Sequence, residues 1–388
     1  MSTEFDDKLS SLMPSRLINR LVVSQKVTSP ENSTMFIQEL RRLGLRVIVR
    51  VNGYRQRGLL TAQYKPFIKP GNRGHDVIAH LYEEYLKEWS HSMQTIVNDS
   101  GQFMEIPVRT RFTDERILKS SLFKSKIALK NAFKLYKDAV MITLTVPHIF
   151  PLVIPIEMEG KIVGYILLQD SIISELKNYL LDWLRQMWKD RKIKTFTAYE
   201  YHKDYNLHLH IIVFGIPYLI DWSRKFGKKK EDALTYYVRK YKIELPPEAE
   251  KSQISKHIFT ALLDKWLIEI LAKFDSVLRI NLLEAYISYK KEHNLQGPIN
   301  EIHKIKDGQW DGEPPKDAII QYSSDDMHKK VLPPDSYIIK YLLKIYSMVS
   351  KGEGIDKENQ AKIYGYWLFG KRFNSYSLSL LLQEKITT

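Results

Sequence analysis

Residues 206–215 read Asn-Leu-His-Leu-His-Ile-Ile-Val-Phe-Gly, and this run predicts a β-strand of the central sheet. Successive side chains of a strand point to opposite faces, so His208 and His210 lie on the same face. Two imidazoles on one face form a two-pronged metal site. A single His-x-His pair also arises by chance in a chain with 11 histidines, so the argument needs further ligands nearby.

A second strand precedes the first. Residues 195–202 read Thr-Phe-Thr-Ala-Tyr-Glu-Tyr-His, and residues 203–206 allow the chain to turn back. Glu200 and His202 share one face of this strand. If the hairpin brings them toward the histidine pair, a carboxylate and up to three imidazoles converge, and such a donor set suits Mg²⁺ or Mn²⁺. Glu200 and His202 both remain candidates for the third metal ligand.

The segment 336–346 reads Ser-Tyr-Ile-Ile-Lys-Tyr-Leu-Leu-Lys-Ile-Tyr and predicts an amphipathic helix, with Asp335 or Ser336 as its N-cap. Its apolar side faces the core. Two pairs of polar residues stack one turn apart on the remaining surface, namely Tyr337 above Tyr341 and Lys340 above Lys344. The predicted helix therefore presents tyrosines and lysines together.

Tyrosines beside lysines on one helix surface offer an oxygen nucleophile with positive charge nearby. A free phenol has a pKa near 10 and is only about one part in a thousand phenolate at neutral pH. Lys340 and Lys344 are expected to favour the phenolate and to hold phosphate. Tyr341 is the preferred nucleophile because both lysines flank it, and Tyr337 offers a second one. The alternative interpretation is that the tyrosines only cover a half-buried face.

The composition excludes some chemistries and points to a polyanionic partner. The chain has no cysteine, which excludes thiolate catalysis, disulfides and cysteine-based zinc sites. It has no GxxxxGK[ST] phosphate loop, so a fused helicase is not expected. The surplus of 59 basic over 45 acidic residues favours nucleic acid as a partner, and an aromatic content of 12% offers stacking platforms for unpaired bases.

Three motifs, in this order, resemble the HUH endonuclease superfamily and in particular its rolling-circle replication initiators. They are the strand 141–147 (Met-Ile-Thr-Leu-Thr-Val-Pro), the His-x-His strand, and the Tyr-x-x-Lys helix. The doubled tyrosine is similar to the two-tyrosine branch. The segment 366–375 (Tyr-Trp-Leu-Phe-Gly-Lys-Arg-Phe-Asn-Ser) is similar to initiators of archaeal plasmids and viruses. The resemblance covers residues 135–385.

The resemblance implies a metal-dependent, site-specific endonuclease and strand transferase of single-stranded DNA. In that family a tyrosine forms a 5′-phosphotyrosine and releases a 3′-hydroxyl for a polymerase. The resemblance implies Glu200 as third ligand beside His208 and His210, Mg²⁺ or Mn²⁺ as cofactor, and origin DNA, a host or accessory helicase and a polymerase as partners. The alternatives are a single-strand transposase and a non-catalytic DNA-binding protein. A histidine-triad hydrolase needs a further histidine where Ile212 stands.

The pattern of elements predicts an α+β fold, with an antiparallel sheet, helices on one face and the other face open for DNA. The resemblance makes this core a ferredoxin-like (RRM-like) HUH palm. We expect an N-terminal extension (1–130), a first part of the nuclease core (135–222), a mostly helical insertion (223–315) and a C-terminal part with the tyrosine helix (316–388).

Several local predictions accompany this division. A helix is expected over 75–97, and a strand over 317–322 is expected to rejoin the sheet. Lys65, in a basic loop, and the basic run 224–230 either contact DNA or lie in solvent. Residues 1–7 are polar and acidic, unlike a signal peptide, and no apolar run is long enough to span a membrane, so we expect a cytoplasmic protein.

Overall fold

The computed structural model describes residues 23–24, 30–49, 51, 53–158, 160–244, 250–321, 329–351 and 357–382, and every structural statement concerns these ranges. Residues 1–7 and Tyr322, the end of the last predicted strand, lie outside them. No helix within these ranges combines the length and the apolar character that crossing a bilayer requires.

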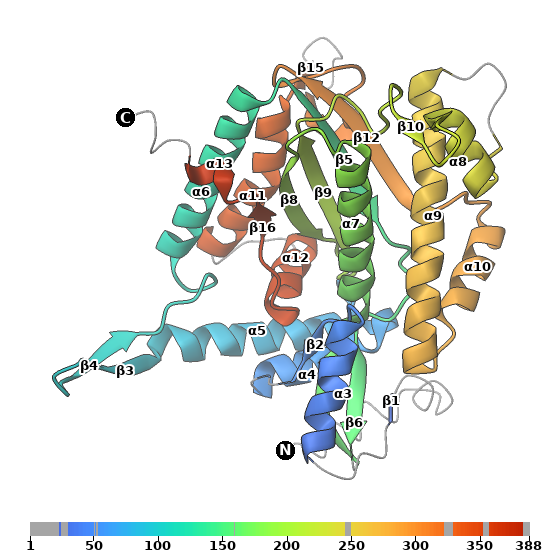
Figure 1. Ribbon diagram of the computed structural model, residues 1–388. Helices are drawn as coiled ribbons and strands as arrows, with labels where there is room; N and C mark the ends of the chain where they lie inside the picture. Colours follow the sequence, from blue (N-terminus) through green and yellow to red (C-terminus); the bar gives the residue numbers. More distant parts are fainter. Residues whose placement is uncertain are drawn as a thin grey trace.

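A six-stranded sheet forms the centre of the molecule (Figure 1). Its order is β13-β12-β5-β9-β8-β16 and neighbouring strands run antiparallel, which agrees with the predicted α+β class. The strands are β5 (Asp138–Thr145), β8 (Lys194–Tyr201), β9 (Leu207–Phe214), β12 (Ile299–Lys306), β13 (Gln309–Trp310) and β16 (Asn374–Tyr376). The histidine strand is β9, and all of its residues except His208 are buried, as suits an interior strand rich in isoleucine, valine and leucine.

The register of the central strands gathers polar residues on one face of the sheet. Glu200 pairs with His208, His210 pairs with Thr143, and Thr143 pairs with Glu301. Residues opposite each other on neighbouring strands point to the same side, and His208 and His210 are two positions apart. The predicted hairpin is therefore confirmed, and these side chains form one polar patch on this face of the sheet.

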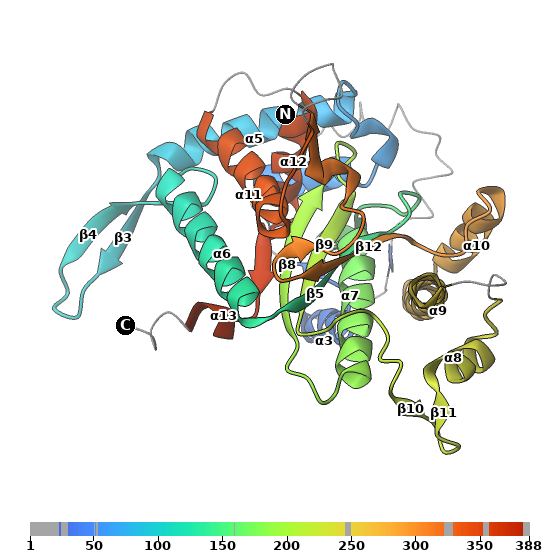
Figure 2. The same ribbon diagram turned by 90° about the horizontal axis from the view of Figure 1, so that it is seen from above.

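Helices cover both faces of the sheet, so the predicted one-sided arrangement is wrong (Figure 2). Lys177 of α7 donates a 3.2 Å hydrogen bond to Tyr199, which points away from the histidines, so α7 lies on the apolar face. On the other face the ring of Tyr341 in α11 stacks on His210. Helix α11 has an apolar side that must also be buried, and it packs between this face and α6. The helices involved are α6 (Glu115–Leu135), α7 (Leu168–Met187), α11 (Pro334–Lys351), α12 (Lys357–Leu368) and α13 (Ser379–Leu382).

The N-terminal third is built into the same hydrophobic core. A second sheet, ordered β1-β6-β7-β2, pairs its two short strands with a hairpin that follows β5. Tyr82 and Tyr85 of α5 each pack against Trp367 of α12 with ring centroids 5.5 Å apart. The elements are β1 (Val23–Ser24), α3 (Pro30–Arg42), β2 (Val47–Ile48), α4 (Gly53–Ala62), the 3₁₀ turn η1 (Lys65–Phe67), α5 (Arg73–His91), β6 (Ile154–Met158) and β7 (Lys161–Ile166).

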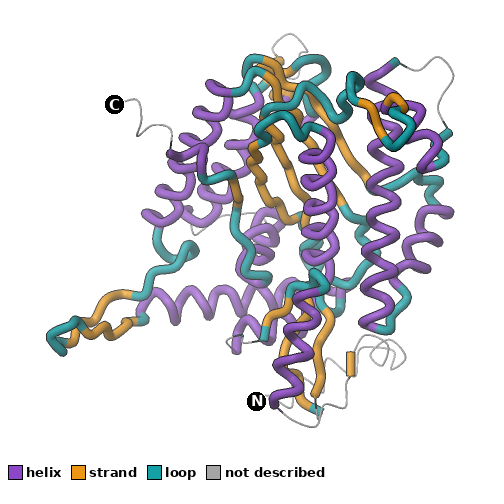
Figure 3. Tube along the Cα trace, viewed as in Figure 1, coloured by secondary structure: helices purple, strands orange, loops and turns teal. Residues whose placement is uncertain are grey.

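The helix predicted over 75–97 is wrong at its C-terminal end, because α5 stops at His91 and a hairpin follows. The side-chain oxygen of Asn98 accepts hydrogen bonds of 2.8 and 3.1 Å from backbone N–H groups of the turn, and Gly101 adopts φ +80°. The hairpin projects beyond the end of α5 (Figure 3). Its strands are β3 (Met93–Val97) and β4 (Phe103–Pro107).

The insertion after β9 contains a strand that the sequence pattern did not reveal. Strand β12 pairs along its whole length with β5, whereas the strand predicted over 317–322 does not rejoin the central sheet. Within the described residues β14 pairs with β15 in a separate sheet. Strand β12 reads Ile-Asn-Glu-Ile-His-Lys-Ile-Lys and lacks an apolar run, because one of its faces lines a polar cavity. The other elements are β10 (Lys225–Phe226), β11 (Glu231–Asp232), α8 (Ala233–Tyr241), α9 (Lys251–Leu278), α10 (Leu282–Glu292), η2 (Lys316–Ala318), β14 (Ile319–Gln321) and β15 (Lys329–Val331).

Candidate functional site

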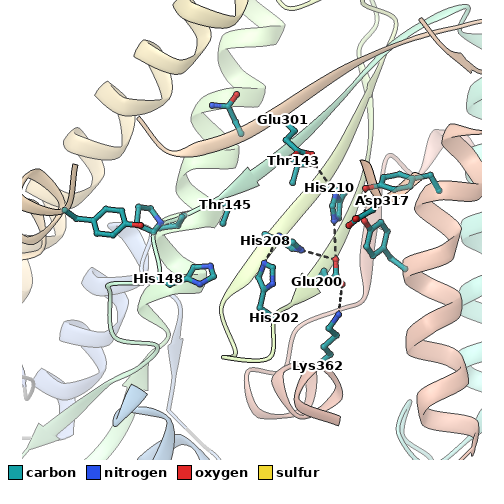
Figure 4. Close-up of a pocket in the computed structure, with 16 residues that line it drawn as sticks. Thr143, Thr145, His148, Glu200, His202, His208, His210, Glu301, Asp317 and Lys362 are labelled. Carbon is teal, nitrogen blue, oxygen red and sulfur yellow. Dashed lines mark hydrogen bonds and ion pairs between the residues drawn. The ribbon is translucent and has the colours of Figure 1, made fainter. Parts of the chain in front are cut away.

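Glu200, His208 and His210 converge on the polar face of the sheet (Figure 4). The Nε2 atoms of His208 and His210 lie 3.0 and 3.3 Å from the same oxygen, Oε2 of Glu200. The three ligand atoms lie within 4.8 Å of one another, so these residues could hold a metal ion. We call them the metal triad. Two imidazole nitrogens and a carboxylate leave coordination positions open for water or substrate.

The carboxyl group of Glu200 is held in its ionised form. Burial opposes ionisation, but hydrogen bonds with His208 and His210 outweigh burial and bring the pKa of Glu200 well below its usual range. Lys362 of α12 adds an ion pair, with Nζ 3.1 Å from the other carboxylate oxygen. No motif in the sequence predicts a role for Lys362. This lysine belongs to α12, which contacts β8 only in the tertiary structure.

His202 lies beside His208 and is not one of the three residues whose ligand atoms converge. Its Nε2 lies 2.9 Å from Nδ1 of His208, and Oγ1 of Thr143 lies 3.1 Å from Nδ1 of His210. Each triad histidine is thereby oriented with Nε2 toward Glu200. Burial and the neighbouring imidazoles lower the pKa of His202 to about 4, so it is neutral at pH 7. The geometry favours Glu200 over His202 as third ligand.

The two tyrosines of α11 lie against the metal triad. Tyr341 donates a 2.7 Å hydrogen bond to the hydroxyl of Tyr337, and the ring of Tyr341 stacks on His210 with centroids 4.4 Å apart. The exposed fraction is 2% for Tyr337 and 7% for Tyr341. Burial raises the pKa of Tyr337 to about 12 despite the hydrogen bond that it accepts, and burial raises the pKa of Tyr341 further. Both phenols are therefore protonated at neutral pH in this arrangement.

The lysines of α11 do not favour the phenolate form as expected. Nζ of Lys340 donates to the backbone oxygen of Asp317 at 2.7 Å and lies 5.9 Å from the centroid of either tyrosine ring. Burial and the charge of Lys362 lower the pKa of Lys344. Lys340 is thus equally distant from both rings, and the reason for preferring Tyr341 as nucleophile is absent from the structure.

The metal triad and both tyrosines line one cavity of about 600 Å³. This volume suits a small ligand or one nucleotide of a longer strand. Figure 4 shows Thr143, His148, Glu301 and Asp317 around the triad, all of which the motifs left unassigned. Only Thr143 had a signal in the sequence, since it stands in the strand 141–147 that forms the first motif. The other three come from the turn after β5, from β12 and from η2, where no local pattern marks them.

Lys65 does not lie free in solvent, so one of the two interpretations of its loop is corrected. Its ammonium group donates to the backbone oxygen of His148, to that of Phe150 at 3.3 Å, and to Oδ1 of Asn206 at 3.2 Å. Burial lowers the pKa of Lys65 to about 8. This lysine therefore ties the N-terminal third to the hairpin loop before β9.

No model of a known protein family, no curated protein and no solved structure matches the chain. The similarity to HUH endonucleases is a resemblance carried by the motifs alone.

Proposed function

We propose that the protein is a metal-dependent, site-specific endonuclease and strand transferase of single-stranded DNA that initiates rolling-circle replication of a plasmid or virus. One observation carries the proposal. Tyr337 and Tyr341, whose hydroxyls share a hydrogen bond, line the same cavity as the metal triad. Covalent attack on a phosphodiester needs an oxygen nucleophile beside a source of positive charge. The motif order that resembles replication initiators supports the same reaction.

The proposed reaction is a transesterification. The phenolic oxygen of one tyrosine attacks the scissile phosphorus, a P–O bond to the protein forms, and the bond to the 3′ oxygen breaks. The phenolic proton ends on that oxygen, so a 3′-hydroxyl is released and no water or co-reactant is consumed. Attack of a 3′-hydroxyl on the phosphotyrosine reverses the step and joins the strand. A host polymerase would extend the released 3′-hydroxyl after an accessory helicase opens the duplex.

Different residues of the cavity have different roles in the proposed reaction. Mg²⁺ or Mn²⁺, held by the metal triad, would supply positive charge to the phosphate oxygens. Lys362 keeps the carboxylate of Glu200 in place for that purpose. Tyr341 would stabilise a phenolate at Tyr337 through the hydrogen bond that it donates. In this proposal Tyr337 is the first nucleophile and Tyr341 the second, which reverses the preference drawn from the helix pattern.

The test uses the whole protein and a pool of single-stranded oligonucleotides of random sequence, because the origin sequence need not be known. With Mn²⁺ present, the wild type should form a covalent adduct that survives denaturing electrophoresis. Mass spectrometry should place the nucleotide phosphate on Tyr337 or Tyr341, and sequencing of the captured strands should reveal a preferred cleavage site. Absence of an adduct with every divalent ion tested would overturn the proposal.

Two variants serve as controls. The double variant Tyr337→Phe/Tyr341→Phe should lose the adduct, while its binding of oligonucleotides stays intact because both rings are retained. Tyr289→Phe changes another tyrosine of the same cavity wall and should form the adduct like the wild type. An adduct that persists in the double variant would place the nucleophile elsewhere.

A further inference from the structure

A second pocket lies apart from the metal triad, among α7, α8, α9 and the β10–β11 hairpin. It encloses about 360 Å³ and shares no lining residue with the first cavity. Figure 2 shows its elements on the side of α7 that is remote from α11. Its walls are aromatic and include Trp183 of α7, Phe226 of β10, Tyr236 and Tyr241 of α8, and Trp266 of α9.

The aromatic rings at the mouth of this pocket retain accessible surface. Phe226, Tyr236 and Tyr241 are half-buried, whereas Trp183 and Trp266 are 9% and 8% exposed and form the floor. The rings of Phe226 and Tyr236 are stacked, with centroids 5.2 Å apart and planes inclined by 20°. Partly exposed, parallel rings over an aromatic floor suit a planar ligand such as a nucleobase.

Two cationic side chains lie beside the rings, and one carboxylate, that of Asp182, also lines the pocket. The guanidinium of Arg224 lies 5.2 Å from the centroid of Phe226, and its Nη1 is buried without a hydrogen-bond partner among the described residues. Nζ of Lys240 lies 5.2 Å from the centroid of Tyr236. The exposed lysines 228–230 continue the positive surface along the turn of the hairpin. A buried donor without a partner is unusual and indicates a missing acceptor, such as a base carbonyl or a phosphate oxygen.

We propose that this pocket, here called the base pocket, binds an unpaired base of single-stranded DNA. The base stacks on Phe226 and Tyr236, Arg224 donates to an acceptor of the base or of its phosphate, and the lysines of the hairpin turn follow the backbone. The choice of DNA as polymer rests on the proposed function. A methylated ammonium ligand, which aromatic cages also bind, is disfavoured because Arg224 and Lys240 already bring positive charge to the rings.

The binding test uses the full chain, excess chelator and a labelled oligothymidylate of about ten nucleotides. Fluorescence anisotropy gives the affinity. Phe226→Ala and Tyr236→Ala should each weaken binding by about tenfold, because a stacking platform is lost. Tyr236→Phe keeps the ring and should bind like the wild type. Phe123→Ala is the matched control, since Phe123 is an exposed aromatic residue on α6 (64% exposed), outside the pocket.

Wild-type affinity in both alanine variants would overturn the proposal that this pocket binds a base. Equal affinity for a duplex of the same sequence would overturn it too, as would displacement of the oligonucleotide by tetramethylammonium at constant ionic strength. A duplex hides the faces of its bases, so stacking predicts weaker binding to it. Wild-type near-ultraviolet circular dichroism in the variants excludes misfolding as the cause. Failure of the adduct assay on Tyr337 and Tyr341 leaves this measurement unaffected, because chelator suppresses the metal triad and only binding is read.

Discussion

At the scale of single residues, Glu200 determines the state of the candidate metal centre. One carboxylate oxygen meets the Nε2 atoms of His208 and His210, and the other meets the ammonium of Lys362. The hydrogen bonds of this arrangement need protons on imidazole nitrogens that a metal ion would occupy. Metal binding should therefore release protons, and the affinity for the ion should rise with pH.

Replacing both triad histidines tests the metal site directly. His208→Ala/His210→Ala should abolish Mn²⁺ binding and adduct formation, because two of the three ligands are lost. Oligonucleotide binding should persist, since it depends on dispersed basic residues. Isothermal titration with Mn²⁺ and the adduct assay measure the two effects. His148→Ala is the control, because His148 lines the cavity without contacting Glu200. Adduct formation in excess chelator would contradict the metal role.

The tyrosine pair makes a prediction about pH. Tyr341→Phe removes the donor to Tyr337, so the pKa of Tyr337 should rise above its value of about 12. The rate of the first cleavage should then fall at neutral pH, and its rise with pH should move to more alkaline values. A second cleavage on the same molecule should be lost. A pH–rate profile that matches the wild type would show that Tyr341 does not assist Tyr337.

His202 predicts a loss of stability in acid. Its pKa is about 4 in the folded protein against an ordinary value of 6.5, so the unfolded chain binds more protons between these values. The contribution of His202 to the free energy of unfolding should be largest above about pH 6.5. It should decline by roughly 2 kcal/mol as the pH falls toward about 4.5. In His202→Gln, which has no titratable group there, the decline should be smaller by this amount. Urea unfolding of both proteins at both pH values measures this difference. An equal decline in the wild type and in His202→Gln would contradict the lowered pKa of His202.

At the scale of elements, the predicted boundary of α5 is wrong where a helical pattern gives way to a hairpin. The helical period of α5 ends at His91, and the β-branched residues that follow form a hairpin closed by the turn at Asn98 and Gly101. Strand β3 is exposed throughout, so no burial on a core stabilises it. In contrast to the exposed strand β3, helix α12 is largely buried, and its Lys362 contacts Glu200.

The hairpin after α5 should be dispensable for folding. Ser92 and Val108 already meet through a 2.9 Å backbone hydrogen bond, so a short glycine–serine linker can replace residues 93–107. The free energy of unfolding should change by less than about 0.5 kcal/mol, because none of these residues is fully buried and only Ile106 is half-buried. Ile78→Ala, in the buried part of α5, should cost about 2–5 kcal/mol in the same denaturant titration. A large decrease in the free energy of unfolding on removing the hairpin would show that the hairpin stabilises the fold.

At the scale of the whole molecule, the N-terminal third and the part of the chain that carries the metal triad depend on each other. Arg46 and Lys371 both pair with the buried carboxylate of Asp170, and Lys65 spans to the loop before β9. Nδ1 of His75 in α5 lies 2.9 Å from the hydroxyl of Tyr205 in the hairpin turn. The hairpin that carries the metal triad is therefore braced from the N-terminal side.

A fragment that begins at residue 135 should not fold as the full chain does. Without α5, the buried rings of Tyr364 and Trp367 lose their partners and become exposed to water. The fragment 135–388 should show weak near-ultraviolet circular dichroism and bind a hydrophobic dye. The full chain, which should show neither property, is the control. Cooperative unfolding of the fragment, with Mn²⁺ affinity equal to that of the full chain, would contradict this dependence.

Short-range regularities of the chain specify a good part of the candidate site. Alternation along a strand is enough to place His208 and His210 on one face, and the hairpin length is enough to bring Glu200 beside them. Helical spacing is enough to pair Tyr337 with Tyr341. These inferences succeed because each depends on the geometry of one element or of two neighbours joined by a tight turn.

Tertiary structure alone decides the rest. The position of Lys362 beside Glu200, the pairing of β12 with β5, and the aromatic pocket beyond α7 each join segments far apart in the chain. Nothing in the local pattern carries this information, because such contacts are selected by the burial of apolar faces across the whole fold. The same burial raises the pKa of the tyrosines, so their protonation state follows from packing and could not be inferred from residue types.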